Sequence, residues 1–518
     1  MPPPVPIPPL VPPANGVTVR MYRQGHGDCF LLAFPRAGGG DPYYVMIDCG
    51  YKPGSNSGDY FTNARSIADV VEHLRAACGG HLDLVILTHE HQDHLNGLWK
   101  ATKPYFDDFE IDEAWVAWTE DPDNTLANQL RTRHKDQLLG LLGARRELAL
   151  AVGESDPAVA RLDALLGLEV GGGEEKPDMA AMLAAAEDPE KSVNKQGLKL
   201  VKDKAAGRKG CFYLYPGIEP VALDGAAGVR AFVFGPPESA ELIADEDPRD
   251  GEGFPAARPL SFAAAGKAAN SAGGEEIERS SPFRRHYSIP REYAFDGETA
   301  LFRSNYGNDT SADDDGDRIE VPAAASWRRI DAEWLYAAET LALKLNTGIN
   351  NTSLVVAFEL PQSKKVLFFA ADAQRGNWVS WKDLRFRDGT GTVTARELLS
   401  RAVLYKVGHH GSHNATLSGT AGDEQPNLAW MGQGAAAAEF TAMITAVNHW
   451  ATTKNSPPWV HPLPSIKEAL LRKAQGRVLQ TDEDRPKKPD TMTDAEWQKF
   501  TDRTVFEDLY FDWQVLDE

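Results

Sequence analysis

The chain has 518 residues, of which 42% are hydrophobic and 25% charged, so its composition is that of a globular protein and excludes overall disorder. Its formal charge of -21 repels polyanions, and a nucleic-acid substrate would therefore need a local basic groove. No run of about 18 apolar residues occurs, which excludes a membrane-spanning helix.

The cysteines and the first residues bear on the compartment. Four cysteines at irregular spacing form neither a CxxC pair nor a disulfide framework: Cys29, Cys49, Cys78 and Cys211. Residues 1–16 are rich in proline and lack the basic start of a signal peptide, so we expect a disordered tail there. Together these features predict a cytoplasmic protein.

Strand-like segments dominate residues 17–120, which we expect to form the first half of the main domain. An amphipathic stretch from Ala64 to Cys78 predicts one helix among them. The predicted strands are Val17–Arg23, Phe30–Phe34, Tyr43–Asp48, Leu84–Leu87 and Ile111–Trp118.

Two long segments then interrupt the strand pattern. Residues 121–223 show helical periodicity and predict a helical insertion, within which His134 falls on one helix face with Leu130 and Leu138. A core strand is predicted within 224–236, and 237–345 reads as a loop-rich insertion.

Strand signals return in residues 346–518, the expected second half of the domain. Ser465 and Glu468 have the spacing of a capping box and predict a helix through about Ala474. The predicted strands are Leu354–Leu360, Val366–Ala370, Ala402–Val407, Ala442–Val447, Arg477–Gln480 and Leu509–Val515. The fold class predicted from this order is α/β.

A cluster of metal-ligating residue types follows the apolar run at Leu84–Leu87. His89, His91, Asp93 and His94 place four ligands within six residues at the end of a buried strand. Alternate imidazoles along an extended loop point to one side, while the next two ligands can turn toward a second ion. Neutral imidazoles with a carboxylate suit zinc, and manganese is an acceptable alternative.

Later strands supply the types of ligand that would complete a two-metal site. Asp372 follows the apolar run Val366–Ala370, where its carboxylate could bridge two cations. His409 and His410 follow the strand Ala402–Val407, and one of the two is expected to bind metal.

Seven motifs occur in an order that resembles the metallo-β-lactamase domain of the ComEC family of DNA-uptake proteins. They are GHGDCFLL at Gly25–Leu32, IDCG at Ile47–Gly50, LTHEHQDHLNGL at Leu87–Leu98, NNTSLVV at Asn350–Val356, FFAADA at Phe368–Ala373, YKVGHHGS at Tyr405–Ser412 and HPLP at His461–Pro464. The resemblance covers about half of the chain. It does not extend to the family's membrane channel, and neither insertion is matched.

The resemblance implies an αββα sandwich with two mixed sheets facing each other and two divalent metal ions at one edge. It implies that His89 and His91 bind one ion, that Asp93, His94 and His410 bind the other, and that Asp372 bridges them. Asp48 and Asp28 are expected to orient ligands. Asn350 occupies the position of a further histidine ligand, and His26 replaces the usual glutamine of the GHGD turn.

The function implied is metal-dependent hydrolysis of a phosphodiester, with DNA or another nucleic acid as substrate and a place in antiviral defence as an effector. In this hypothesis Asp93 contributes to catalysis as well as to metal binding. His409 or His461 protonates the leaving oxygen, and Ser412 and Lys406 hold phosphate oxygens. Two alternatives stay open: an acyl, thioester or lactone hydrolase on the same centre, and a regulatory module that binds a protein partner through the insertions.

Overall fold

The computed structural model describes residues 7–60, 65–100, 103–170, 179–188, 191–217, 219–255, 342, 345, 348–389, 391–454 and 459–518. The chain divides into two compact units. The first unit comprises Met1–Leu139, Leu166–Ala256 and Leu345–Glu518, and the second comprises Gly140–Leu165 and Ala257–Lys344. The sheets and the candidate site described below belong to the first unit.

Apart from Ala342, the described residues of the second unit belong to two helices and the turn between them. The helices are α3 (Thr125–Val152) and α4 (Pro157–Val170), and both also extend into the first unit. Arg145 is buried there and pairs with Asp163 at 2.7 Å and with Glu154 at 2.7 Å. A buried guanidinium that keeps both carboxylate partners avoids the large cost of an unpaired internal charge.

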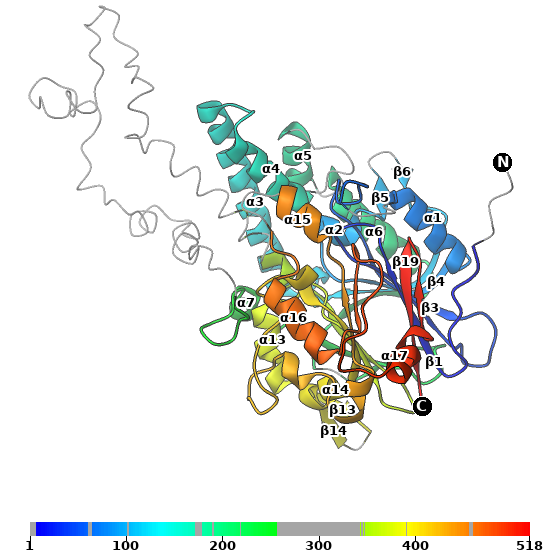
Figure 1. The fold of residues 1–518 in the computed structure, drawn as a ribbon. Coiled ribbons are helices and arrows are strands. Elements are labelled where there is room, and N and C mark those ends of the chain that lie inside the picture. Colours follow the sequence, from blue (N-terminus) through cyan, green and yellow to red (C-terminus); the bar gives the residue numbers. More distant parts are fainter. Residues whose placement is uncertain are drawn as a thin grey trace, which may run out of the picture. The chain divides into compact units, whose positions relative to one another are not determined.

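The first sheet has eight strands. Figure 1 labels four of them, β1, β3, β4 and β19. In spatial order they are β18 (Thr504–Phe506), β19 (Tyr510–Leu516), β1 (Gly16–Tyr22), β2 (Cys29–Phe34), β3 (Tyr43–Cys49), β4 (His81–Leu87), β7 (Glu110–Ala117) and β8 (Gly210–Leu214). Pairing is antiparallel from β18 to β3 and parallel from β3 to β8.

The second sheet has seven strands and is also mixed. In spatial order they are β17 (Val478–Gln480), β16 (Thr441–Ile444), β15 (Ala402–Lys406), β12 (Val366–Phe369), β11 (Val355–Glu359), β10 (Arg230–Gly235) and β9 (Val221–Ala222). The pairs from β17 to β12 are parallel, and those from β12 to β9 are antiparallel. The predicted α/β class with two mixed sheets is therefore confirmed.

Alternate side chains of these strands enter two different cores, which explains why the strands read as continuous apolar runs. In β2, Phe30 and Leu32 join a core made from both sheets, whereas Leu31 packs on the opposite face. In β11, Phe358 joins the shared core and Ala357 lies on the other face. The two sheets thus face each other across one apolar layer.

Helices cover the two outer faces. α1 (Ile67–Ala77) and α6 (Val193–Ala206) contribute Val70, Leu74 and Val201 to the core outside the first sheet. α13 (Arg375–Ser380), α14 (Ala395–Ser400) and α16 (Pro464–Lys473) contribute to the core outside the second. This layering is compatible with an αββα sandwich.

The remaining helices are shorter or lie off these faces. They are α2 (Gln92–Leu95), α5 (Met179–Glu187), α7 (Ala240–Ile243), α15 (Asn448–Lys454) and α17 (Asp494–Thr501), and β5 (Trp99–Lys100) with β6 (Lys103–Pro104) and β13 (Arg385–Asp388) with β14 (Gly391–Thr394) form two small hairpins.

The structure differs from the predicted boundaries at both ends of the helical insertion and near the first residues. Helical structure ends at Ala206. β8 then adds to the first sheet and β9 to the second, so the helical insertion is shorter than the predicted segment, which reaches residue 223. From residue 7 the predicted tail is placed against the domain: Leu10 is buried and its amide donates to Ala77 O at 2.8 Å. Residues 1–6 and most of the predicted loop insertion lie outside the described residues.

The helix predicted from the Ser465 and Glu468 pair begins differently. Pro464 occupies its first turn, and Leu463 precedes it without a side-chain cap. The Ser465 hydroxyl instead donates to Pro255 O at 2.7 Å. Among the residues that the structure describes, no helix is both long and apolar enough to cross a membrane.

Candidate metal centre

The predicted ligands gather where parallel strands of the two sheets end. Thr88 and His89 follow β4, Asp372 follows β12, and His410 follows β15. The carboxyl ends of neighbouring parallel strands share one edge of a sheet, which is where open α/β sheets place their ligands. The strand order thus brings residues together that are more than 300 positions apart in the sequence, such as Asp93 and His410.

Two glycines let the histidine-rich loop approach the rest of the site. A Cβ atom on Gly50 would lie 2.3 Å from His94 N, and one on Gly27 would lie 2.5 Å from Asp93 O. Such distances are far inside van der Waals contact, so these positions require glycine. Both belong to the short motifs that the sequence analysis singled out.

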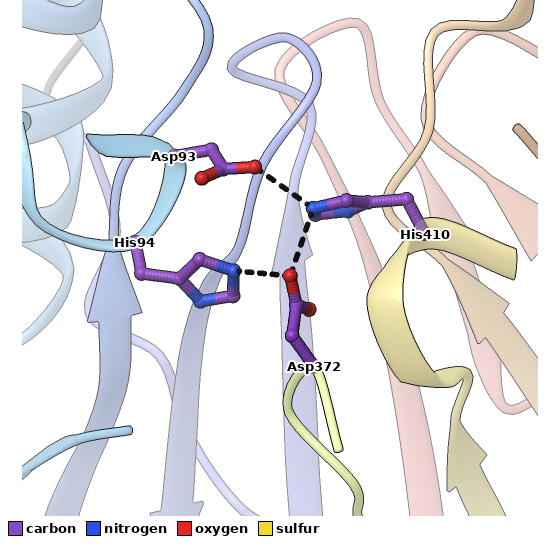
Figure 2. A group of neighbouring side chains, drawn as sticks. All are labelled: Asp93, His94, Asp372 and His410. Carbon is purple, nitrogen blue, oxygen red and sulfur yellow. Dashed lines mark hydrogen bonds and ion pairs between the residues drawn. The ribbon is translucent and has the colours of Figure 1, made fainter. Parts of the chain in front are cut away.

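Four of the predicted ligands form one buried group, here called the carboxylate cluster: Asp93, His94, Asp372 and His410. Figure 2 shows His94 and His410 converging on the Asp372 carboxylate. His94 Nε2 lies 3.2 Å and His410 Nε2 lies 3.6 Å from Asp372 Oδ2, and His410 Nε2 lies 3.0 Å from Asp93 Oδ2. One ligand atom from each residue falls within 4.8 Å of all the others.

The other ring nitrogens of this cluster already have partners. His94 Nδ1 donates to Asp48 Oδ2 at 2.7 Å, and His410 Nδ1 donates to Thr445 O at 3.0 Å. These bonds fix each ring so that Nε2 is the atom presented to the carboxylates. Burial opposes a charge on His94, but Asp372, Asp28 and Asp48 raise its pKa well above the ordinary value, so without a metal ion this ring supplies the positive charge between the carboxylates.

Buried atoms without hydrogen bonds mark the same place. His94 Nε2, Asp372 Oδ2 and Asp93 Oδ1 all lack a hydrogen-bond partner, although buried polar groups are normally satisfied. Atoms of this kind, from imidazoles and carboxylates, are the ligands preferred by zinc and manganese. The donor set therefore fits a divalent metal ion.

His89 and His91 form a second group, here called the histidine pair. His89 Nε2 lies 3.1 Å from His91 Nδ1. The opposite nitrogens are engaged elsewhere: His89 Nδ1 is 3.1 Å from Thr88 Oγ1, whose own hydrogen goes to Asp48, and His91 Nε2 is 3.3 Å from Glu169 Oε1. With these partners, the two facing nitrogens can present electron pairs, which is the type of ligand atom that a metal ion binds.

Asp372 lies between the two groups. Its Oδ2 atom is 3.9 Å from His89 Nε2 as well as 3.2 Å from His94 Nε2. Burial alone would raise the pKa of Asp372, but the surrounding histidines and Lys406 hold it well below the usual range. The carboxylate is therefore ionised and placed where the predicted bridging role requires it.

Two buried lysines balance the carboxylates. Lys406 Nζ contacts Asp28 Oδ2, lies 3.5 Å from Asp372 Oδ1 and donates to Ala371 O at 2.9 Å. Lys52 Nζ lies 3.4 Å from Asp93 Oδ1, and burial lowers its pKa. Lys406 is thus engaged with two carboxylates, and its contact with a phosphate stays a prediction.

The residues predicted for proton transfer lie beside the centre. His409 Nε2 is 4.0 Å from Asp372 Oδ2 and 3.3 Å from Asn350 Nδ2, and burial lowers the pKa of His409 to about 4. Burial and neighbouring histidines lower the pKa of His461 well below its ordinary value. Both rings are neutral near pH 7 in this arrangement, which suits a proton acceptor better than the predicted proton donor.

The other predicted residues can also be placed. Asn350 is buried, with its Oδ1 atom lacking a hydrogen-bond partner, and Asp28 accepts from Thr445 Oγ1 at 2.6 Å. Ser412 is buried in the turn after His410, where its amide donates to His409 O at 2.8 Å. His26 stacks on His461 with ring centroids 5.5 Å apart.

Backbone conformation singles out the same region. Six described residues other than glycine have positive φ, and four of them belong to this site or adjoin it: Asp48 (54°), Ala371 (49°), His409 (41°) and His410 (54°). Left-handed backbone is unfavourable for residues with a Cβ atom and gathers at functional sites. Strain maintained at four positions around one group of ligands indicates a functional centre.

Sequence reasoning missed several residues that support the centre. Glu169 contacts His91, Lys52 contacts Asp93, and Ser353 Oγ accepts from the Asp372 amide at 3.2 Å. Ser353 and Lys52 lie close to motifs that were recognised, but their residue types carry no signal of their own. Glu169 has only the helical pattern around it.

Comparison with known proteins adds no relative. No protein-family model matches the chain, and no curated protein sequence matches it either.

Proposed function

We propose that the chain is a metal-dependent hydrolase of the metallo-β-lactamase fold that uses two divalent ions to cleave phosphodiesters in nucleic acid. The observation that carries the metal-binding part is the orientation of the imidazoles. The Nδ1 atoms of His89, His94 and His410 are directed to other partners, and their Nε2 atoms are turned toward Asp372. This arrangement gathers imidazole nitrogens around one carboxylate, which is the donor set that a divalent ion binds.

Two subsites follow from the two groups of ligands. The histidine pair would hold one ion, with Asn350 beside it, and Asp93, His94 and His410 would hold the other, with Asp372 between the two subsites. When bound, divalent ions lower the pKa of a coordinated water molecule and neutralise charge that develops on a phosphodiester. Zinc fits the imidazole ligands, and manganese fits the oxygen-rich side of the centre equally well.

The chain's own residues have definable tasks in this proposal. Asp48 and Thr445 fix the rings of His94 and His410, and Lys406 holds the Asp372 carboxylate from the side opposite the histidines. His409, a neutral ring 18% exposed at its side chain, is the group best placed to accept a proton from an incoming reactant.

The substrate class rests on the motif resemblance together with the side chains beside the centre. Lys52 Nζ lies 3.4 Å from Asp93 Oδ1 and 5.5 Å from the centre of the Trp459 ring. Lys52 is paired with Asp93, so the aromatic face of Trp459 is the part of this arrangement suited to stack on a base. We also propose a cytoplasmic setting, since all four cysteines are free and three are buried.

The proposal is tested with purified chain that has been stripped of metal and reloaded with Mn²⁺ or Zn²⁺. We expect cleavage of single-stranded DNA, duplex DNA or RNA, and loss of cleavage in Asp372→Asn. Asp490→Asn, the same change at an exposed position, serves as the matched control. Hydrolysis of a thioester or lactone without cleavage of any nucleic acid would refute the phosphodiesterase part and leave the metal centre standing.

A further inference from the structure

The helical segment reaches the candidate metal centre through one carboxylate. Glu169, near the end of α4, has a side chain only 3% exposed and lies between two imidazoles. Its Oε1 atom is 3.3 Å from His91 Nε2, and its Oε2 atom is 3.0 Å from Nε2 of His134 on α3. Each oxygen therefore has a separate histidine partner.

This carboxylate determines which nitrogen of His91 is available. An ionised Glu169 can only accept hydrogen bonds, so His91 carries its proton on Nε2 and presents Nδ1 to His89 Nε2, 3.1 Å away. Burial works against ionisation, but His134 and His91 hold the pKa of Glu169 well below its usual range. Histidine ligands of metal sites are commonly oriented by a carboxylate in this way.

Further contacts fix α4 against the ligand loop. Asn194, fully buried near the start of α6, donates from Nδ2 to Glu90 O at 2.9 Å and to Leu168 O at 3.0 Å. Glu90 lies between the two members of the histidine pair, and Leu168 precedes Glu169. The same amide group therefore connects the loop that carries the ligands with the helix that carries the carboxylate.

We infer that Glu169, supported by His134, is a positioning residue for the histidine pair, and that the helical segment thereby sets the affinity of this subsite for its metal ion. The inference rests on the metal-binding part of the proposed function and is independent of the substrate. The carboxylate cluster has its own supports in Asp48 and Thr445, so a change at Glu169 should act on one subsite and spare the other.

The test is a titration of the full-length, metal-free chain with Co²⁺ alone, followed by calorimetry and by visible absorption of the bound ion. For Glu169→Ala we expect about 10- to 100-fold weaker binding of one ion and less than about 3-fold change for the other, since loss of a group that orients a ligand has effects of this size. Glu169→Gln should show a smaller loss in the same subsite. Glu147→Gln, the same change at an exposed position of α3, should bind both ions like the unaltered chain.

A second readout needs no metal. In ¹⁵N spectra of histidine-labelled, metal-free chain, the His91 ring should carry its proton on Nε2 in the unaltered protein and become a mixture of both tautomers in Glu169→Ala. Should Glu169→Ala fail to fold, Glu169→Gln decides by the same two measurements. Unchanged affinity of both ions in a folded Glu169 variant would overturn the inference, whereas failure of the unaltered chain to bind any Co²⁺ would overturn the metal centre as well.

Discussion

The two halves of the candidate metal centre are supported by different parts of the chain. The residues that support the carboxylate cluster lie at or next to strand ends. They are Asp48 near the end of β3, Thr445 after β16 and Lys406 at the end of β15. The histidine pair depends on Glu169, which a long helical segment supplies. The two sheets therefore supply the supports of the carboxylate cluster, whereas the histidine pair also needs the helical segment.

The halves also differ in charge. The carboxylate cluster contains two ionised ligands, Asp93 and Asp372, whose pKa values are both held well below the usual range, whereas the histidine pair contains no carboxylate. Carboxylates attract a divalent cation over a longer range than imidazoles do. We therefore expect the first ion to bind in the carboxylate cluster and the second in the histidine pair.

The largest effect should come from Asp372→Ala, because the Asp372 carboxylate faces ligand nitrogens of both halves. The loss in affinity for both ions should exceed the about 10- to 100-fold that follows removal of a group behind a ligand. Metal content measured after dialysis checks this, with Asp490→Ala as control. Retention of two ions by the variant would show that the halves are independent.

Lys406→Met should cause the next largest change, this time in stability. Removing the ammonium leaves Asp28 and Asp372 as buried carboxylates without their shared cation, a change that costs about 3–5 kcal/mol in comparable buried pairs. Denaturant unfolding in EDTA measures the loss. With saturating Mn²⁺ the loss should be smaller, because the ion supplies positive charge to Asp372.

Lys382→Met, at an exposed position, controls for the substitution itself. An equal loss of stability with and without Mn²⁺ would mean that the ion does not reach Asp372.

Asp48→Asn should act mainly on the carboxylate cluster, the half that Glu169→Ala is expected to spare. Asparagine tolerates the left-handed backbone found at this position, so the change weakens the acceptor for His94 Nδ1 without adding strain. Affinity should fall about 10- to 100-fold for the ion in the carboxylate cluster and by a smaller factor for the other, whose ligand His89 Asp48 reaches only through Thr88. In the Co²⁺ titration this pattern is the reverse of that expected for Glu169→Ala, and the same pattern from both variants would disprove the division into halves.

The smallest expected effect is on the pH dependence of the free energy of unfolding, and it comes from His73, which lies outside both halves. Burial and Arg20 lower the pKa of His73 to about 4, so the unfolded chain takes up a proton at this ring before the folded chain does. The stability contributed by the neutral ring is complete above pH about 6.5 and is lost as the pH falls toward 4.

His73→Gln should therefore lose about 1 kcal/mol less stability between pH 7 and pH 5 than the unaltered chain, after allowance for the half-exposed ring. Unfolding curves of the metal-free protein at several pH values measure this difference. An equal pH dependence in both proteins would assign the acid sensitivity to other groups.

Most of the sheet framework could be predicted from sequence, because strands buried on both faces appear as continuous apolar runs. The predicted strand Phe30–Phe34 matches β2 (Cys29–Phe34) within one residue, and Val366–Ala370 matches β12 equally well. β8 was missed because it lies at a sheet edge and is less buried: Phe212 is 45% exposed, so the segment has no clear apolar pattern.

The residues of the candidate site were likewise only partly predictable from sequence. The candidate ligands could be selected because histidines and aspartates after strands are unusual and because their motifs follow a known order. Glu169 could not be selected, since a glutamate on a helix is ordinary and only the folded chain brings it to His91. His134 was expected on a helix face, and its carboxylate partner became visible only in three dimensions.

The pairing of β1 with β19 determines when this site can exist during synthesis. Gly16 is paired with Leu516, so the first sheet stays incomplete until β19 has left the ribosome. A nascent chain of about 100 residues already carries His89, His91, Asp93 and His94 but lacks Asp372, His410 and the strand that closes the sheet. If the proposed activity holds, the growing polypeptide is harmless to nucleic acid until the residues up to Leu516 have been made.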